Sequence, residues 1–267
     1  MLSRSAGPRA QAGWVRVDCH LHTVASGDAV LTLEQLAERA RRTGLDVVCI
    51  TDHNVTSAAM AAAGRDLGVR VVVGEEIRTP DGDVIGLFLT ERIPYVLPLP
   101  EVVGRIRTQG GLVYAPHPFD QVRSSLGRVL PGLCEEGAVD IIEVFNAKIA
   151  DQALNDRAAE LAGVFTLPGG VGSDAHDAPG VGAAYLEMPD FDGPASFLAA
   201  LAHARMSGEF RPHAPRYPRR PPGSGRTGYA AGDSDQPQAG VTARCGSPAA
   251  RGGSYRHRAR ARWTSPA

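Results

Sequence analysis

The sequence predicts an α/β barrel, in which parallel strands alternate with helices. Three observations lead to this prediction. Short apolar runs typical of buried parallel strands recur along the first two-thirds of the chain, helix signals separate them, and most runs are followed by a polar motif containing histidine or a carboxylate. Because the carboxyl ends of successive parallel strands meet on one face of such a barrel, we expect these motifs to lie together there.

Five apolar runs carry the motifs. Residues 14–17 precede Asp18-Cys19-His20-Leu21-His22, residues 47–50 precede Thr51-Asp52-His53, residues 71–73 precede Gly74-Glu75-Glu76, residues 112–114 precede Pro116-His117-Pro118, and residues 165–171 lead less cleanly into Gly172-Ser173-Asp174-Ala175-His176. A further run, residues 184–188, predicts a late strand. The five motifs contain five of the eight histidines, so the ligand set spans two-thirds of the chain.

Helix signals lie between the strands. Thr32 and Gln35 form a capping box at the start of a helix that Gly44 ends. Further helices are expected over residues 57–67 (stopped by Gly68), 101–108, 151–161 and 196–204. Strands alternating with helices of this length predict a largely parallel sheet.

Composition divides the chain into three parts. We expect a flexible N-terminus over residues 1–13 and one catalytic domain over residues 14–210. Residues 1–210 together contain 17 basic and 27 acidic residues. Residues 211–267 contain eleven arginines, no lysine, two aspartates, eight prolines and eight glycines, with Val241 as the one large aliphatic residue. Such a tail is expected to be disordered, and its abrupt loss of apolar pattern also suits an out-of-frame translation product.

Neither a membrane span nor a secretion signal is expected. No apolar run approaches the roughly 20 residues that cross a bilayer, and no apolar segment follows the basic N-terminus. The four cysteines have no paired spacing, and Cys49 is expected to be a buried strand residue. A reduced, cytoplasmic protein is the simplest interpretation.

The His20-Leu21-His22 motif carries the first indication of chemistry. Alternate side chains of an extended segment point to one side, so both imidazoles can hold one cation. Taken alone, two core or surface histidines would be the better interpretation. Joined to four further motifs at strand ends, the pair predicts a polynuclear site, and mixed imidazole and carboxylate ligands suit Zn, Mn or Fe.

On these motifs the chain resembles the PHP (polymerase and histidinol phosphatase) domain family of metal-dependent phosphoesterases. The similar stretches are residues 18–28, 44–54, 74–76, 116–119, 143–146 and 172–176, and the likeness spans about residues 14 to 190 in unbroken order. The resemblance implies a distorted seven-stranded βα barrel that holds two or three divalent ions (Mn, Fe or Zn).

The resemblance also implies a ligand set. His20, His22, Glu76 and Asp174 would surround a first metal, Glu76 would bridge to a second metal that His117 also binds, and Asp28, His53 and His176 would bind a third. The family usually has another histidine about ten residues beyond the bridging glutamate, and here Asp83 is the nearest match. Either Asp83 replaces it or the second metal is less completely held.

The expected reaction is hydrolysis of a phosphate ester by a metal-bound hydroxide, since adjacent cations lower the pKa of a shared water toward about 7. Asp174, His53 and His176 are the candidate catalytic residues. Either histidine could protonate the leaving alcohol, provided that it is not itself bound to a metal.

Arg123, Arg78 and Lys148 are the candidates for binding substrate phosphate. For each arginine a surface side chain, paired with an acid such as Asp120 or left in solvent, is the alternative, and for Lys148 a solvated lysine. Asp18 and Asp52, next to ligand motifs, are expected either to orient imidazoles or to have ordinary loop roles.

The leading hypothesis is therefore a metal-dependent phosphoesterase acting on a small phosphorylated metabolite, a nucleotide or a short oligonucleotide. A histidinol phosphatase is the alternative within the same fold. An alternative of another class is a nucleic-acid-binding protein acting through Arg256, Arg258, Arg260 and Arg262 of the tail. The sequence leaves the oligomeric state open.

Overall fold

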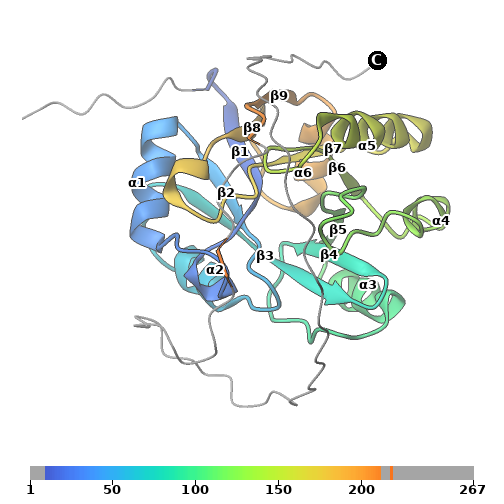
Figure 1. Ribbon diagram of the computed structural model, residues 1–267. Coiled ribbons are helices and arrows are strands. Elements are labelled where there is room, and N and C mark those ends of the chain that lie inside the picture. Colours follow the sequence, from blue (N-terminus) through green and yellow to red (C-terminus); the bar gives the residue numbers. More distant parts are fainter. Residues whose placement is uncertain (1–9, 212–216, 219–267) are drawn as a thin grey trace, which may run out of the picture.

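A nine-stranded mixed sheet organises the molecule. The computed structural model describes residues 10–211 and 217–218, and its strands run in the order β7-β6-β5-β4-β3-β2-β1-β8-β9 (Figure 1). The strands are β1 (Trp14–Leu21), β2 (Val47–Ile50), β3 (Arg70–Thr79), β4 (Gly82–Leu87), β5 (Leu112–Ala115), β6 (Ile141–Asn146), β7 (Gly169–Gly172), β8 (Ala184–Pro189) and β9 (Arg205–Gly208).

The expectation of a largely parallel sheet is wrong for half of the strand pairs. Strands β1, β2 and β3 are parallel to one another, as are β5, β6 and β7, but β4 is antiparallel to both of its neighbours and β8 is antiparallel to β1 and β9. The reversal at β4 has a local cause. Strand β3 continues to Thr79 and turns through Pro80 and Asp81 into Gly82, whose φ of +143° suits glycine.

The sheet curls into a nearly closed barrel because the segment after β7 reaches β1. The Asp174 amide donates to the His20 carbonyl at 2.8 Å, and the His22 amide donates to the Ala175 carbonyl at 2.8 Å. A parallel bridge joins Leu21 to Ala175. This closure brings the first and last ligand motifs together and confirms the distorted barrel that the sequence predicts.

The helices lie around the outside of the sheet (Figure 1). They are α1 (Leu33–Thr43), α2 (Ser57–Ala63), α3 (Leu99–Thr108), α4 (Leu130–Glu135), α5 (Gln152–Phe165) and α6 (Pro194–Leu201), with 3₁₀ turns η1 (Val24–Ser26) and η2 (Ala178–Gly180). The predicted capping box of Thr32 and Gln35 is confirmed, and Gly44 ends α1 in the left-handed conformation. Helix α2 is four residues shorter than predicted, and beyond it the Asp66 carboxylate accepts from the Gly68 amide, a local bond that competes with helix.

Apolar side chains fill both sides of the sheet. One buried cluster lies among strands β1 to β8 with α3, α5 and α6, and a second packs α1 and α2 against β1 and β2. Cys49 is fully buried in β2, as predicted, and Cys19, Cys49 and Cys134 are free thiols. Among the described residues, no helix combines the length and apolarity that a membrane span requires. Most of the predicted disordered tail and most of the predicted flexible N-terminus lie outside the described residues.

Candidate metal centre

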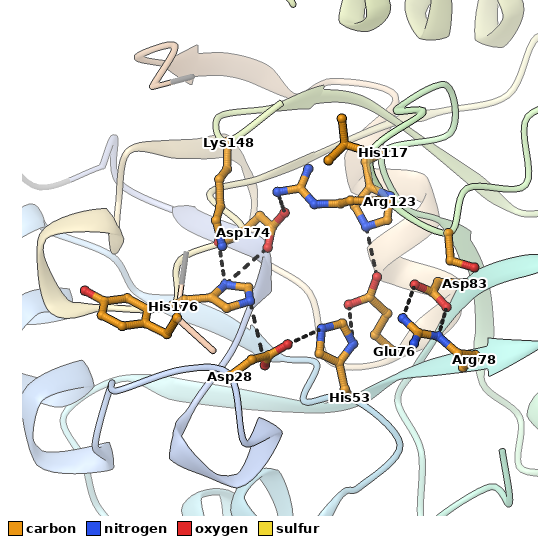
Figure 2. Close-up of a pocket in the computed structure, with 13 residues that line it drawn as sticks. Asp28, His53, Glu76, Arg78, Asp83, His117, Arg123, Lys148, Asp174 and His176 are labelled. Carbon is orange, nitrogen blue, oxygen red and sulfur yellow. Dashed lines mark hydrogen bonds and ion pairs between the residues drawn. The ribbon is translucent and has the colours of Figure 1, made fainter. Parts of the chain in front are cut away.

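The strand ends bring the five ligand motifs together, and four of the five line one cavity of about 260 Å³ (Figure 2). His20 and His22 lie at the end of β1, His53 follows β2, and Glu76 lies within the long strand β3. The remaining ligand candidates follow later strands: His117 follows β5, while Asp174 and His176 follow β7. The cavity is lined by Asp28, His53, Glu76, Arg78, Asp83, His117, Val122, Arg123, Ser124, Lys148, Asp174, His176 and Tyr217.

Glu76 lies between three of the imidazoles. Its Oε1 is 2.9 Å from His117 Nε2, and its Oε2 is 3.0 Å from His53 Nδ1 and 3.2 Å from His22 Nε2. The carboxylate is almost fully buried. Its two oxygens therefore face different histidines, which is the arrangement that a carboxylate shared by two cations requires.

Asp174 and Asp28 supply carboxylates on the other side of the cluster. Asp174 Oδ1 lies 3.4 Å from His176 Nδ1 and 3.6 Å from His22 Nε2. Asp28 Oδ2 is 3.4 Å from His53 Nε2, and Asp28 Oδ1 is 3.9 Å from His176 Nε2. Figure 2 shows Asp28 between the two histidines.

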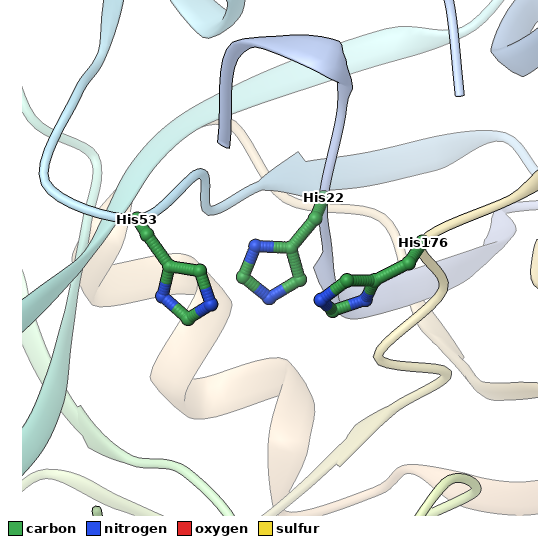
Figure 3. A group of neighbouring side chains, drawn as sticks. All are labelled: His22, His53 and His176. Atoms are coloured by element: carbon green, nitrogen blue, oxygen red, sulfur yellow. The ribbon is translucent and has the colours of Figure 1, made fainter. Parts of the chain in front are cut away.

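The donor set fits divalent cations. In the described part of the chain three groups bring their ligand atoms within 4.8 Å of one another: His22 with His53 and His176 (Figure 3), His20 with Glu76 and His117, and His20 with His22 and Asp174. The Nε2 atoms of the fully buried His20 and His22 are only 3.0 Å apart. These two buried imidazoles present nitrogen atoms to each other, and the neighbouring Glu76 Oε2 has no hydrogen-bond partner. A bound cation would give all three atoms a partner.

Burial and charge set the protonation of the imidazoles before any metal binds. Burial, with the charges of neighbouring histidines, lowers the pKa of His22, and burial lowers the pKa of His176 to about 4. Both rings therefore present lone pairs at neutral pH. Burial also acts on His53, but the carboxylates of Glu76 and Asp28 outweigh it and raise the pKa of His53 to about 10. A metal at His53 must displace a proton.

Glu143 orients the ligand candidates His20 and His117, a role that the sequence did not indicate. This buried carboxylate in β6 contacts His20 Nδ1 through Oε1 at 3.0 Å, and its Oε2 accepts the His117 amide at 2.6 Å. It also accepts from the Tyr114 hydroxyl and from the Asn146 side chain. Ser26 Oγ lies 2.9 Å from His22 Nδ1. Carboxylates and hydroxyls on the second ring nitrogen fix the tautomer and direction of a ligand imidazole.

Asp18 and Asp52 bind backbone amides and a threonine hydroxyl rather than imidazole rings. Asp18 Oδ1 accepts the Ser173 amide at 3.0 Å, and Asp52 accepts the amide and hydroxyl of Thr23 at 2.6 and 2.7 Å. They tie the loops that carry ligands to each other across the barrel mouth. The expectation that these carboxylates orient imidazoles is therefore wrong for the contacts described, and the loop-role alternative describes them.

The backbone is strained or crowded at the site itself. His117 and Asp174 have φ values of +28° and +48°, a region that residues other than glycine rarely adopt. Gly172 ends β7 where a Cβ would collide with His20 and the Glu143 carboxylate. The fold thus holds unfavourable conformations where the ligand candidates meet.

The three candidate phosphate-binding residues all line the cavity, each with an acidic neighbour. Arg123 Nη2 lies 2.7 Å from Asp174 Oδ2, and its Nη1 donates to the buried Asp120 at 3.0 Å. Lys148 is only 6% exposed and points toward Asp174 and His176 (Figure 2), so the solvated-lysine alternative does not describe it.

Arg78 and Asp83 face each other across the β3–β4 hairpin. The guanidinium contacts both Asp83 oxygens at 3.2 and 3.3 Å, and the arginine side chain is 45% exposed. Asp83 thus lines the cavity with its oxygens on Arg78, and within the described residues it does not belong to the three groups of converging ligand atoms.

The barrel and the nitrogen–oxygen cluster at its mouth define the class of protein, a metal-dependent hydrolase. The PHP domain signature matches residues 18–165, and a PHP-associated signature matches residues 152–206. The chain belongs to the PHP domain family of metal-dependent phosphoesterases, as its motifs predicted.

The chain is also similar to two relatives in sequence and to a solved structure in fold. Two uncharacterized proteins of Methanocaldococcus jannaschii are similar to the chain: one is 36% identical over 154 residues (53% of this chain and 88% of the relative), the other 37% over 199 residues (70% and 79%). A two-domain protein of Bacteroides vulgatus, described as containing a predicted PHP-like metal-dependent phosphoesterase, matches 78% of this chain and 70% of its own with a TM-score of 0.60. At 17% identity it shows the shared fold alone.

Proposed function

We propose that this enzyme hydrolyses the phosphate ester of a small molecule, a class that includes phosphorylated metabolites, nucleotides and short oligonucleotides. One observation carries the proposal: six of the ligand candidates line the same cavity of about 260 Å³ as the three cations Arg78, Arg123 and Lys148. The six are Asp28, His53, Glu76, His117, Asp174 and His176. A site that joins metal ligands to side-chain cations suits a doubly charged phosphoryl group. The modest volume favours a small substrate.

The proposed ligand set is the one that the motifs indicate. His20, His22, Glu76, His117 and Asp174, with Asp28, His53 and His176 around the third group, would hold divalent Mn, Fe or Zn. Bound cations supply an activated water and neutralise phosphoryl oxygens. Asp83 is less suited to coordination because Arg78 occupies both of its oxygens.

The protein's own cations would orient the phosphoryl group. Arg123 is held by Asp120 on one side and by Asp174 on the other, so its guanidinium is fixed before substrate binds. Lys148 adds a buried positive charge beside Asp174 and His176. Together they would bind the oxygens that carry charge in the transition state, and Arg78 at the cavity edge would contribute less.

The alternatives that the sequence left open gain no specific support. No described residue selects histidinol phosphate over other esters. The arginines of a nucleic-acid-binding tail lie outside the described residues.

Hydrolysis of 4-nitrophenyl phosphate by protein loaded with Mn²⁺ tests the proposal. The parent should release nitrophenol, while His20→Ala and Asp174→Ala should lose the activity. His203→Ala is the matched control, because this exposed histidine follows α6 away from the cavity. Equal activity in all four proteins would overturn the site assignment. Competition with histidinol phosphate and with nucleotides would then rank the substrate classes.

A further inference from the structure

The cavity lining also contains apolar surface, which has no role in binding a phosphate group. Eleven of its thirteen residues are charged, histidine or serine, and the other two, Val122 and Tyr217, offer apolar surface. Neither side chain can bind a phosphoryl oxygen through charge or hold a divalent cation well. Both side chains line the same cavity as the phosphate-binding candidates.

Val122 is an exposed apolar side chain on a fixed loop. It is 62% exposed, and in the described part of the chain only Met60, Val96 and Val164 are comparable large apolar side chains. Its amide donates to Asp120 Oδ1 at 2.9 Å, while Asp120 Oδ2 accepts from Arg123 at 3.0 Å. The same buried aspartate therefore sets the position of Val122 and of the phosphate-binding candidate next to it.

The loop is also attached to the β3–β4 hairpin. The Asp83 amide donates to the Ser124 carbonyl at 2.7 Å, and Gly82 lies so close to the Ser125 backbone that a Cβ would collide with it. Val122 is thus presented to the cavity by a loop anchored at both ends. An apolar side chain held in this way beside a cationic site is available for a ligand.

Tyr217 provides a ring on the His176 side of the cavity. Its hydroxyl donates to Asp177 Oδ2 at 2.9 Å, and Asp177 directly follows His176. Because the polar end of the side chain is occupied by this bond, the ring itself is the surface that Tyr217 offers to the cavity. Val122 directly precedes Arg123, and Tyr217 bonds the residue that follows His176, so the two side chains line the cavity beside different labelled residues of Figure 2.

We propose that Val122 and Tyr217 form a subsite for the leaving group, which selects phosphate esters whose alcohol carries a planar, apolar ring over esters of small polar alcohols. The inference rests on the proposed phosphoesterase function and names the substrate class of that same site. A planar ring can pack on the phenol face and on the valine methyl groups while its phosphate lies on Arg123 and the metal ligands.

Two phosphonates that cannot be hydrolysed separate this subsite from catalysis. Phenylphosphonate and methylphosphonate share the charged head and differ only in the ring, and calorimetry on the Mn²⁺-loaded full chain gives the affinity of each. The parent should prefer phenylphosphonate by about tenfold or more, the ratio that an apolar ring contributes when it is removed from water.

Substitutions at the subsite should change that ratio alone. Tyr217→Ala and Val122→Ser should each reduce the preference about threefold to tenfold while leaving methylphosphonate affinity within twofold. Tyr217→Phe keeps the ring and loses the bond to Asp177, and should retain most of the preference. Val164→Ser is the matched control, since this valine is 75% exposed on α5 and does not line the cavity.

The outcomes distinguish the two proposals. If both phosphonates bind and neither Tyr217→Ala nor Val122→Ser alters the ratio, the subsite is wrong and the proposed function stands. If neither phosphonate binds the loaded protein, the proposed function fails and the subsite fails with it. Hydrolysis of 4-nitrophenyl and glycerol phosphates should give the same change in the ratio of kcat/KM.

Discussion

The metal-ligand cluster and the cationic wall of the same cavity are held in place by different means. Apart from Asp28, which follows η1, the cluster residues lie on strands or in the segments that follow them. Backbone hydrogen bonds between β1 and the segment after β7 fix His20, His22 and Asp174 relative to one another. The cations Arg78, Arg123 and Lys148 depend on nearby carboxylates, through side chains of high conformational freedom. The comparison teaches that the barrel backbone sets the geometry of the metal-ligand cluster. The three cations, here called the cationic wall, can be substituted without changing the fold.

Among the substitutions considered, Glu76→Gln should have the largest effect on metal binding and activity. The amide keeps the volume of the buried side chain but removes the charge that faces His117, His53 and His22. We expect loss of at least one bound metal and a fall in kcat/KM of about a thousandfold, since several kcal/mol of charge stabilisation are lost. Metal content and steady-state kinetics on one preparation check this. Full metal content with parental kcat/KM would contradict a shared-carboxylate role.

Glu143→Gln should have a smaller effect of the same kind. Glu143 contacts a ligand ring and a ligand backbone, so its loss should disturb orientation rather than remove a ligand. The expected drop in metal affinity is about tenfold to a hundredfold, with an unchanged circular dichroism spectrum. Glu136→Gln, at an exposed position after α4, is the control. A Glu143 variant with parental affinity would limit its role to packing.

Metal affinity should rise with pH. Carboxylates raise the pKa of His53 to about 10, so at neutral pH the metal-free ring is protonated and binding must release that proton. Burial acts against the charge of His20, but the carboxylates of Glu143, Asp174 and Glu76 outweigh it and raise the pKa of His20 as well. Affinity is therefore lowest at acid pH and should increase with pH by up to about tenfold per unit for each proton that the ligands release. His176, with its pKa lowered to about 4, adds no dependence above about pH 5. Calorimetry in two buffers of different ionisation enthalpy counts the protons, and zero release at pH 7 would be inconsistent with these assignments.

The cationic wall should give the smallest effects. Arg123→Lys keeps a charge but loses the two-sided contact with Asp120 and Asp174, and we expect KM to rise about tenfold with bound metal retained. Arg78→Lys should change KM less than threefold, because its side chain is 45% exposed and screened by solvent. Phosphate inhibition constants of the two variants provide the check. A loss of bound metal in Arg123→Lys would contradict the claim that the cationic wall and the metal-ligand cluster are held independently.

The sequence pattern predicted those strands and helix ends that depend on residues close together in the chain. The apolar runs before His20, His53 and His117 and the capping box at Thr32 all appear where the sequence indicates them. The β3–β4 hairpin was missed because no strand was predicted for the residues of β4, although Pro80-Asp81-Gly82 is a turn signal. Recognising that turn would have predicted the reversal in the sheet.

Contacts distant in sequence could not be predicted. Glu143 and His20 are separated by 123 positions, and a carboxylate within an apolar strand gives no local indication of its partner. The same holds for Tyr217, whose partner Asp177 is 40 positions away and which lies in a segment that composition predicts to be disordered. The ligand types were predictable from motifs, whereas the groups that orient them depend on the closed barrel.

The central claim is that the strand-end residues form a polynuclear metal centre. Elemental analysis of protein purified without chelators, beside His20→Ala and the control His203→Ala, tests it most directly. We predict about two to three equivalents of Mn, Fe or Zn per chain in the parent and the control, and at least one equivalent fewer in His20→Ala. Absence of bound metal from the folded parent, even after loading with Mn²⁺ or Zn²⁺, would contradict the claim.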